Sequence, residues 1–174
     1  MKLKYSPLGS SNFFKDGIQD WIQVDLRATA RRRMLEALVA GKVKDFEYEL
    51  VDFVEQVFSY HDTERRYAEN FYHAFFPGLL AGLEHQYHLS SNREAGYGRF
   101  DICLTPKNPA DRGIIIEIKA PECDTNQTIQ DALAAAVAQL KEKKYEKNLE
   151  AAGVRNILRI AIAVQGKMVK VKAG

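Results

Sequence analysis

The sequence predicts a mixed α/β fold in which helices come first, strands follow, and one later helix crosses between two strands. Two short runs, 113–119 and 156–164, are rich in isoleucine and other apolar residues, which is typical of buried strands. The segment before residue 84 instead repeats apolar residues at helical spacing. Between the two runs lies an alanine-rich stretch, 127–150, long enough for a crossover helix, which the handedness rule places on one face of the sheet.

Three helices are expected ahead of the sheet. The first spans 17–40 and ends at Gly41, and the second spans 45–59. The third spans 64–83 and contains Pro77, which should kink the helix or split it in two, because proline lacks the amide hydrogen that a helix interior needs.

Strands are expected on both sides of the crossover helix. A first strand at 85–89 precedes a pair at 99–105 and 113–119, whose connecting loop contains two prolines and is longer than a tight turn, so that the pair forms a hairpin. After the crossover helix, the buried strand 156–164 turns into 168–172. The alternation of apolar and charged residues in this last segment is typical of a half-exposed edge strand.

The length and composition predict one folded domain. Of the 174 residues, 1–16 form a flexible arm without a clear period, and 17–174 form a single domain with a helical part at 17–83 and a sheet core at 84–174. Two cysteines do not make the disulfide framework of a secreted protein, and no apolar segment approaches the roughly 20 residues of a membrane span. A cytoplasmic protein without a membrane partner is therefore expected.

Net charge gives no strong argument for a nucleic acid partner, because the chain carries only +2 at pH 7. Basic residues nevertheless cluster at 27–33, 141–147 and 167–172. Each cluster has two interpretations: it is a solvated helix face or charged edge strand, or it contacts nucleic acid.

The stretch 96–119 places charges in strands that are otherwise apolar. Glu117 and Lys119 share one face of their strand, about 6–7 Å apart at a rise of about 3.3 Å per residue. Asp101, in the neighbouring strand, can lie opposite them. Charges inside a sheet need a pairing partner or a metal, and two carboxylates with one lysine suit a hard divalent cation that takes oxygen ligands.

Other polar positions are open to more than one explanation. Glu69 and His73 lie at i and i+4 on the apolar face of the third helix, where a buried glutamate needs a partner. A Glu69–His73 pair or a hydrogen bond to a neighbouring helix meets that need. Arg99 either contacts a phosphate or pairs with Glu94. Gln139 borders the apolar stripe of the crossover helix and is, by spacing alone, an ordinary exposed residue.

At Asp101, Glu117 and Lys119 the chain resembles the PD-(D/E)XK nuclease superfamily, whose signature is Asp, a hairpin loop, two hydrophobic residues, Glu, any residue and Lys. Phe100 stands where the signature has proline, a position that varies widely in the superfamily. Further sequence segments, at 69–73, at 94–101 and at 138–139 ahead of Tyr145, resemble the branch often found behind an AAA-type ATPase-like module in bacterial proteins. The resemblance covers about residues 37–171.

The resemblance implies a restriction-endonuclease-like mixed sheet with an α-β-β-β-α-β core, here with an N-terminal helical extension. It also implies hydrolysis of phosphodiester bonds, most simply in DNA and by an endonuclease. The implied cofactor is Mg²⁺, with Mn²⁺ as a substitute, held by Asp101, Glu117 and the backbone carbonyl of Ile118. Lys119 then positions or activates the attacking water.

The resemblance implies contributions from two helices as well. Glu69 approaches the metal from the helix before the sheet, directly or through water, and Gln139 points back toward the site from the crossover helix. Supporting roles fall to His73, Glu94, Arg99 and Tyr145.

A second function stays open, that of a nucleic-acid-binding or regulatory module of an ATPase-associated system that keeps the nuclease fold without turnover. The short length, the near-neutral charge and the family's occurrence as one part of larger proteins favour the module. The presence of every residue that the chemistry requires favours the nuclease. Expected partners are nucleic acid, an ATPase-like partner or domain, and a second copy in a homodimer.

Overall fold

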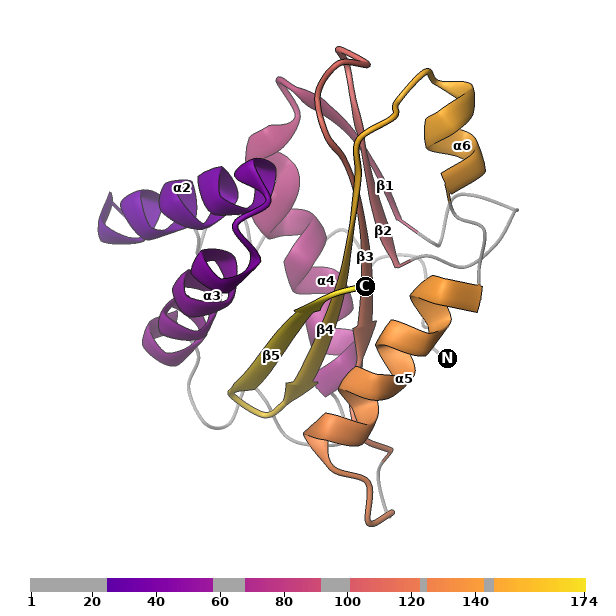
Figure 1. The fold of residues 1–174 in the computed structure, drawn as a ribbon. Coiled ribbons are helices and arrows are strands. Elements are labelled where there is room, and N and C mark those ends of the chain that lie inside the picture. Colours follow the sequence, from indigo (N-terminus) through magenta and orange to yellow (C-terminus); the bar gives the residue numbers. More distant parts are fainter. Residues whose placement is uncertain (1–24, 58–67, 92–100, 123–124, 143–145) are drawn as a thin grey trace, which may run out of the picture.

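The computed structural model describes residues 25–57, 68–91, 101–122, 125–142 and 146–174 (Figure 1). Its elements, in chain order, are α2 (Asp25–Ala40), α3 (Val43–Val57), α4 (Ala68–Leu80), the 3₁₀ turn η2 (Ala81–Leu83), β1 (Tyr87–Ser91), β2 (Ile102–Pro106), β3 (Gly113–Lys119), α5 (Ile129–Glu142), α6 (Glu146–Ala151), β4 (Ile157–Gln165) and β5 (Met168–Ala173).

The strands form one sheet in the order β1-β2-β3-β4-β5. β3 and β4 run parallel, and the other neighbouring pairs are antiparallel. β2 and β3 make the predicted hairpin, while α5 and α6 supply the crossover that two parallel strands require. The predicted mixed α/β fold is confirmed.

Helices cover both faces of this sheet. Figure 1 shows the sheet almost edge-on, with α2, α3 and α4 on one side and α5 and α6 on the other. Because side chains alternate along a strand, β3 sends Ile114, Ile116 and Ile118 into the larger core beneath α2, α3 and α4. Ile115 points the other way, into a smaller cluster that includes Ala136 of α5. We call these two sides the large-core face and the small-core face.

The hairpin loop between β2 and β3 fixes the end of α2. Gly41 follows the helix at φ +72°, and the amide of Lys42 donates to the carbonyl of Ala37, which is the Schellman arrangement that favours glycine. Arg112 donates to the carbonyl of Val39 at 3.1 Å and lies where a Cβ on residue 41 would be. The predicted stop at Gly41 is confirmed, and the loop supplies part of it.

Pro77 does not split its helix. α4 continues through Pro77 to Leu80 and tightens into η2. The guanidinium of Arg31, on α2, donates to the carbonyls of Gly78 and Leu79, next to the proline, and so binds the last turn of α4 to α2. Of the two predicted outcomes, a kink or a split, the split is wrong because the proline lies close to a helix end that α2 holds in place, and the kink stays a prediction.

The single helix predicted at 127–150 is also wrong, since the structure has α5 and α6 on either side of residues 143–145. The position of α6 has a packing reason. Leu149 of α6 is fully buried and reaches the start of β3, where a Cβ on Gly113 would lie 3.0 Å from its Cδ1. Arg159 of β4 pairs with Glu146 and holds the start of α6 against the sheet.

Smaller differences concern boundaries. α3 begins two residues before its predicted start, and β1 lies two residues after the strand expected at 85–89. The predicted arm at 1–16 and the start of the first predicted helix lie outside the described residues, so the division into arm and domain stays a prediction. None of the described helices combines the length and apolar character that crossing a membrane requires.

Candidate active site

The carboxyl end of β3 carries Glu117 and Lys119 on the small-core face. Glu117 is 0 % exposed, and its Oε1 lies 3.5 Å from Nζ of Lys119, whose side chain keeps 30 % of its exposure. The two charges therefore share one face, as the sequence predicted, and the ammonium reaches from a fully buried carboxylate toward solvent. An ionised carboxylate taken out of water requires such a compensating charge.

Asp101 joins this pair through the backbone. Its Oδ2 accepts a hydrogen bond of 2.7 Å from the amide of Ile118, the residue between Glu117 and Lys119. β2 begins at Ile102, which is opposite Ile116, so Asp101 stands one residue before the strand and level with Glu117. The expected strand at 99–105 is thus shorter at its start, and the hydrogen bond rather than the ladder orients the carboxylate.

The neighbouring strand places only small side chains beside this site. Across the parallel ladder, Glu117 is opposite Ala161 and Lys119 is opposite Ala163, and both alanines are buried. Side chains this small let α5 pack close to β4, where Ala161 clusters with Ala136 and Leu140.

α5 closes the small-core face. Thr128 and Asp131 form a capping box at its start, in which Oδ2 of Asp131 accepts from the amide of Thr128 at 2.8 Å and the amide of Asp131 donates back to Oγ1 at 3.3 Å. Ala136 and Leu140 are buried against β3 and β4. Gln139 is half-buried on this helix, and its orientation toward the site stays a prediction.

α4 brings its first turns to the same end of the sheet from the large-core face. The hydroxyl of Tyr72 donates to the carbonyl of Gly166, in the turn after β4, at 2.9 Å. Since β3 and β4 are parallel, that turn lies at the end of the sheet where Glu117 and Lys119 stand. Glu69 precedes Tyr72 by three residues in α4, and Figure 1 shows the start of this helix beside the carboxyl end of β3.

The hydrogen bond of Tyr72 is a contact that the sequence analysis did not predict. A buried tyrosine hydroxyl needs a hydrogen-bond partner, and that need was the available signal. Burial raises the pKa of Tyr72 well above its usual 10.0, so the hydroxyl stays protonated and remains a donor.

Several predicted site residues lie outside what the structure describes. Glu94, Arg99 and Tyr145 fall in 92–100 and 143–145, and the side chains of Glu69 and His73 are not described although their backbone belongs to α4. The alternatives of a Glu69–His73 pair or an Arg99–Glu94 pair therefore stay predictions.

The residues that do meet here fit a divalent cation with oxygen ligands. Among the described residues, no group of three or more His, Cys, Asp or Glu side chains gathers at one place. Mg²⁺ does not need such a cage, because it keeps several waters and binds through one or two carboxylates. An ionised carboxylate offers about four lone-pair sites, so Asp101 can bond the amide of Ile118 and still bind a metal.

The fold and this constellation define a class. A hairpin that holds an aspartate against a Glu-x-Lys strand end, in a mixed sheet between helical layers, is the arrangement of metal-dependent nucleases that the sequence resembled. Comparison with protein families matches residues 67–174 to the PD-(D/E)XK nuclease superfamily, and the chain belongs to this superfamily. No curated protein matches the chain.

The matched segment begins one residue before α4 and contains every predicted site residue from Glu69 to Tyr145. α2 and α3 precede it. Membership confirms the predicted resemblance to the superfamily, and it assigns the chain to a family of nucleases that use divalent metal ions and act on nucleic acid. The resemblance to a branch found behind ATPase-like modules stays a prediction.

Proposed function

We propose that this protein is a Mg²⁺-dependent DNA nuclease, an endonuclease in which Asp101, Glu117 and the carbonyl of Ile118 hold the metal. The observation that carries the proposal is the hydrogen bond from the amide of Ile118 to Asp101, which brings the aspartate to the strand end where Glu117 and Lys119 stand. Family membership supports the reaction class.

Mg²⁺, when bound, would supply a Lewis acid and lower the pKa of a water that it holds. A side chain of the protein is proposed to act on the water or the phosphate. Lys119 is a donor beside Glu117, and its partly exposed ammonium can reach a water or a phosphoryl oxygen at the mouth of the site. Help of this kind is worth about a hundredfold to ten-thousandfold in rate.

The helices on the two faces complete the proposal. Glu69, near the start of α4, is proposed to hold the water shell of the metal, and the bond from Tyr72 to Gly166 supports this placement of the helix. Gln139, on α5, is proposed to orient the water or substrate from the small-core face. His73, Glu94, Arg99 and Tyr145 are proposed to support the site.

The test is cleavage of circular plasmid, linear DNA and RNA with Mg²⁺ or Mn²⁺, and with EDTA. Asp101→Asn and Lys119→Gln should each slow cleavage at least about a hundredfold. Asp111→Asn and Lys107→Gln are matched controls, because both residues are exposed in the hairpin loop at the opposite end of β3. Controls should cut at the wild-type rate.

Each substrate decides one part of the proposal. Opening of the closed circle requires an internal cut, so degradation of linear DNA alone would replace the endonuclease with an exonuclease. Cleavage of RNA alone would overturn the choice of DNA. If the wild type and both site variants leave all three substrates intact, the proposal that the protein is a nuclease is wrong for these substrates.

A second candidate, the non-catalytic module, is favoured by one contact. Lys119 lies 3.5 Å from Oε1 of Glu117, so an ion pair without a metal also compensates the buried carboxylate. Calorimetric titration with Mg²⁺ and Mn²⁺ in the presence of uncleavable DNA separates the two. Metal binding that is lost in Asp101→Asn supports the nuclease, and the absence of binding supports the module.

A further inference from the structure

The last strand of the sheet carries two lysines on the face of the candidate site. Lys170 is opposite Ala163, which is in turn opposite Lys119 of β3. One step along, Lys172 is opposite Ala161, which is opposite Glu117. Residues that share such a row point to the same side of a sheet, so both lysines stand on the small-core face together with the proposed catalytic groups.

The packing of β5 fixes this orientation. Val169 and Val171 are buried in the large core, so the residues between them must face the other way. The carboxylate of Glu47, on α3, accepts a hydrogen bond of 2.9 Å from the amide of Val171 and covers part of the open edge of the strand. A shift of register by one residue would bury both lysines and is therefore strongly disfavoured.

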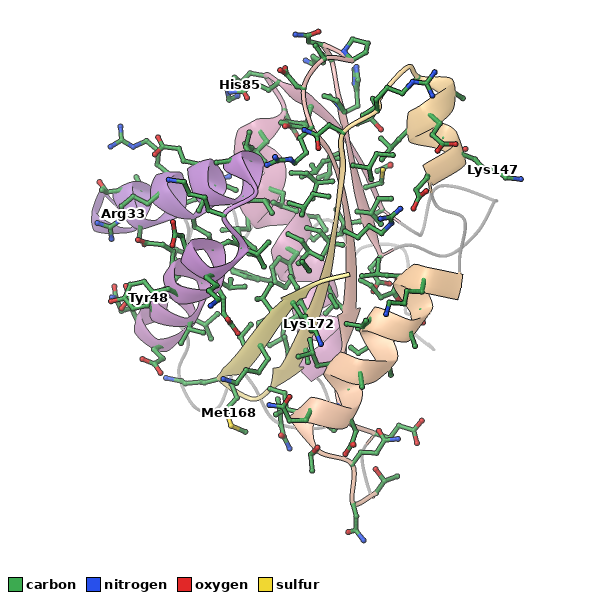
Figure 2. All side chains as sticks on the ribbon, in the orientation of Figure 1. Arg33, Tyr48, His85, Lys147, Met168 and Lys172 are labelled. Atoms are coloured by element: carbon green, nitrogen blue, oxygen red, sulfur yellow. The ribbon has the colours of Figure 1, made fainter. Side chains whose placement is uncertain are left out.

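α5 borders the two lysines on the site's own side. At the end of β5, a Cβ on Gly174 would lie 3.0 Å from Cδ1 of Leu140, which shows that this helix packs over the same face. Figure 2 labels Lys172, which lies between β5 and α5. Both Lys170 and Lys172 are exposed.

The ammonium groups of Lys170 and Lys172 differ in their contacts from three arginines of the chain. Arg33 pairs with Glu49, Arg159 pairs with Glu146, and Arg112 bonds the carbonyl of Val39. Within the part of the chain that the structure describes, Lys170 and Lys172 form no ion pair with an acidic group. Their charge is available to an anion from outside.

We propose that Lys170 and Lys172 bind backbone phosphates of the nucleic acid strand whose scissile phosphate lies at Lys119. This rests on the proposed function for the position of the scissile phosphate. Two strand spacings of about 4.8 Å separate Lys170 from Lys119, about 10 Å in all, so one nucleic acid strand can contact these lysines within a few nucleotides. Of the two interpretations of the basic cluster at 167–172, the proposal therefore favours contact with nucleic acid over a charged edge strand that faces only solvent.

The test measures binding without cleavage. Anisotropy of a short fluorescein-labelled DNA duplex, and of the single strand alone, is followed in EDTA over a range of NaCl concentrations. Lys170→Gln with Lys172→Gln should lower the slope of log K against log [NaCl] by about 2, that is about 1 for each lost phosphate contact. Lys44→Gln with Lys107→Gln removes the same charge from exposed positions on α3 and the hairpin loop, and should leave the slope unchanged.

The arginine pair, Lys170→Arg with Lys172→Arg, should keep the wild-type slope, since the charge remains. Equal slopes for the glutamine pair and the wild type would overturn the proposal, as would equal losses in both glutamine pairs or no DNA binding by the wild type.

Cleavage is scored separately, so that the two proposals fail independently. A wild type that cuts DNA while the Lys170/Lys172 glutamine pair binds with an unchanged slope overturns only the phosphate contacts. A wild type that cuts nothing, but whose binding slope falls in that pair alone, supports the contacts and removes the nuclease.

Discussion

The two faces of the sheet differ although the same strands build both. On β3, Ile116 is buried in the large core, while the next residue, Glu117, is equally buried on the small-core face as a carboxylate. On β4, Ile160 and Ile162 alternate in the same way with Ala161. At this end of the sheet one face consists of large apolar side chains, and the other combines small residues with charged ones.

The helices repeat this difference. α3 and α4 bring aromatic rings to the large-core face, among them Phe53, Phe75 and Phe76, with ring centroids 5.4 Å apart for the last two. α5 presents Ala132 and Ala136 to the other face. Burial of large apolar groups is the main source of stability, so the large-core face should contribute most of the stability, while the small-core face carries the candidate site.

The largest expected effect is on activity, at Glu117. In Glu117→Gln, metal-dependent cleavage should fall about a hundredfold to ten-thousandfold, a range that loss of one catalytic group often produces. The free energy of unfolding should change by no more than about 1 kcal/mol, because removing a buried charge also removes its desolvation penalty. Lys119 can be hydrated when it loses this partner, since its side chain is 30 % exposed. Urea denaturation and plasmid cleavage measure the two quantities.

The matched change on the other face is Ile116→Ala, one residue earlier on β3. It should lower the free energy of unfolding by about 2–5 kcal/mol, because a buried isoleucine leaves a cavity. Cleavage at a temperature where the variant is folded should stay near the wild-type rate. A Glu117→Gln protein that loses as much stability as Ile116→Ala would contradict the comparison and make Glu117 a structural residue.

The sequence predicted the parts of the site that local pattern determines. β3 was expected at 113–119 and has those bounds, because an isoleucine run between a glycine and Ala-Pro has few alternatives. The alternation that followed put Glu117 and Lys119 on one face. Asp101 was expected opposite them, but the bond from Ile118 that holds it there depends on where the hairpin loop lets β2 begin.

Long-range packing determined what the sequence did not predict. The break between α5 and α6 depends on Leu149 reaching Gly113, and nothing in the helical period of 127–150 marks that contact. The placement of Lys170 and Lys172 on the site's face needs the register of three strands at once, which no local pattern supplies.

A smaller effect is expected at the glycines that end one helix on each face. Gly41 after α2 and Gly153 after α6 have φ of +72° and +82°, and in both cases the next amide bonds a carbonyl five residues earlier. Alanine at either position should lower the free energy of unfolding by about 1–2 kcal/mol through its left-handed backbone.

The surroundings of the two glycines differ, so a comparison of the two alanine variants measures the contribution of the hydrogen bond from Arg112 to the carbonyl of Val39. A Cβ at residue 153 meets only Cβ of Pro109, at 3.6 Å, whereas at residue 41 it would displace the guanidinium of Arg112 from the carbonyl of Val39. Gly41→Ala should therefore lose about 1 kcal/mol more than Gly153→Ala in urea denaturation, which is the usual net contribution of one intramolecular hydrogen bond. Equal losses would mean that Arg112 contributes nothing to the large-core face.

The smallest effect concerns the start of α5, on the small-core face, and it depends on pH. Hydrogen bonds from the amide and the hydroxyl of Thr128 hold the pKa of Asp131 below its usual 3.8. Because the pKa is lower in the folded chain than in the unfolded chain, this carboxylate stabilises the fold above about pH 3.8 and ceases to do so as the pH falls through the lowered value. Thermal unfolding of wild type and Asp131→Ala should thus differ at neutral pH and converge at acidic pH. A difference that persists unchanged in acid would show that the side chain acts by packing and not by accepting these bonds.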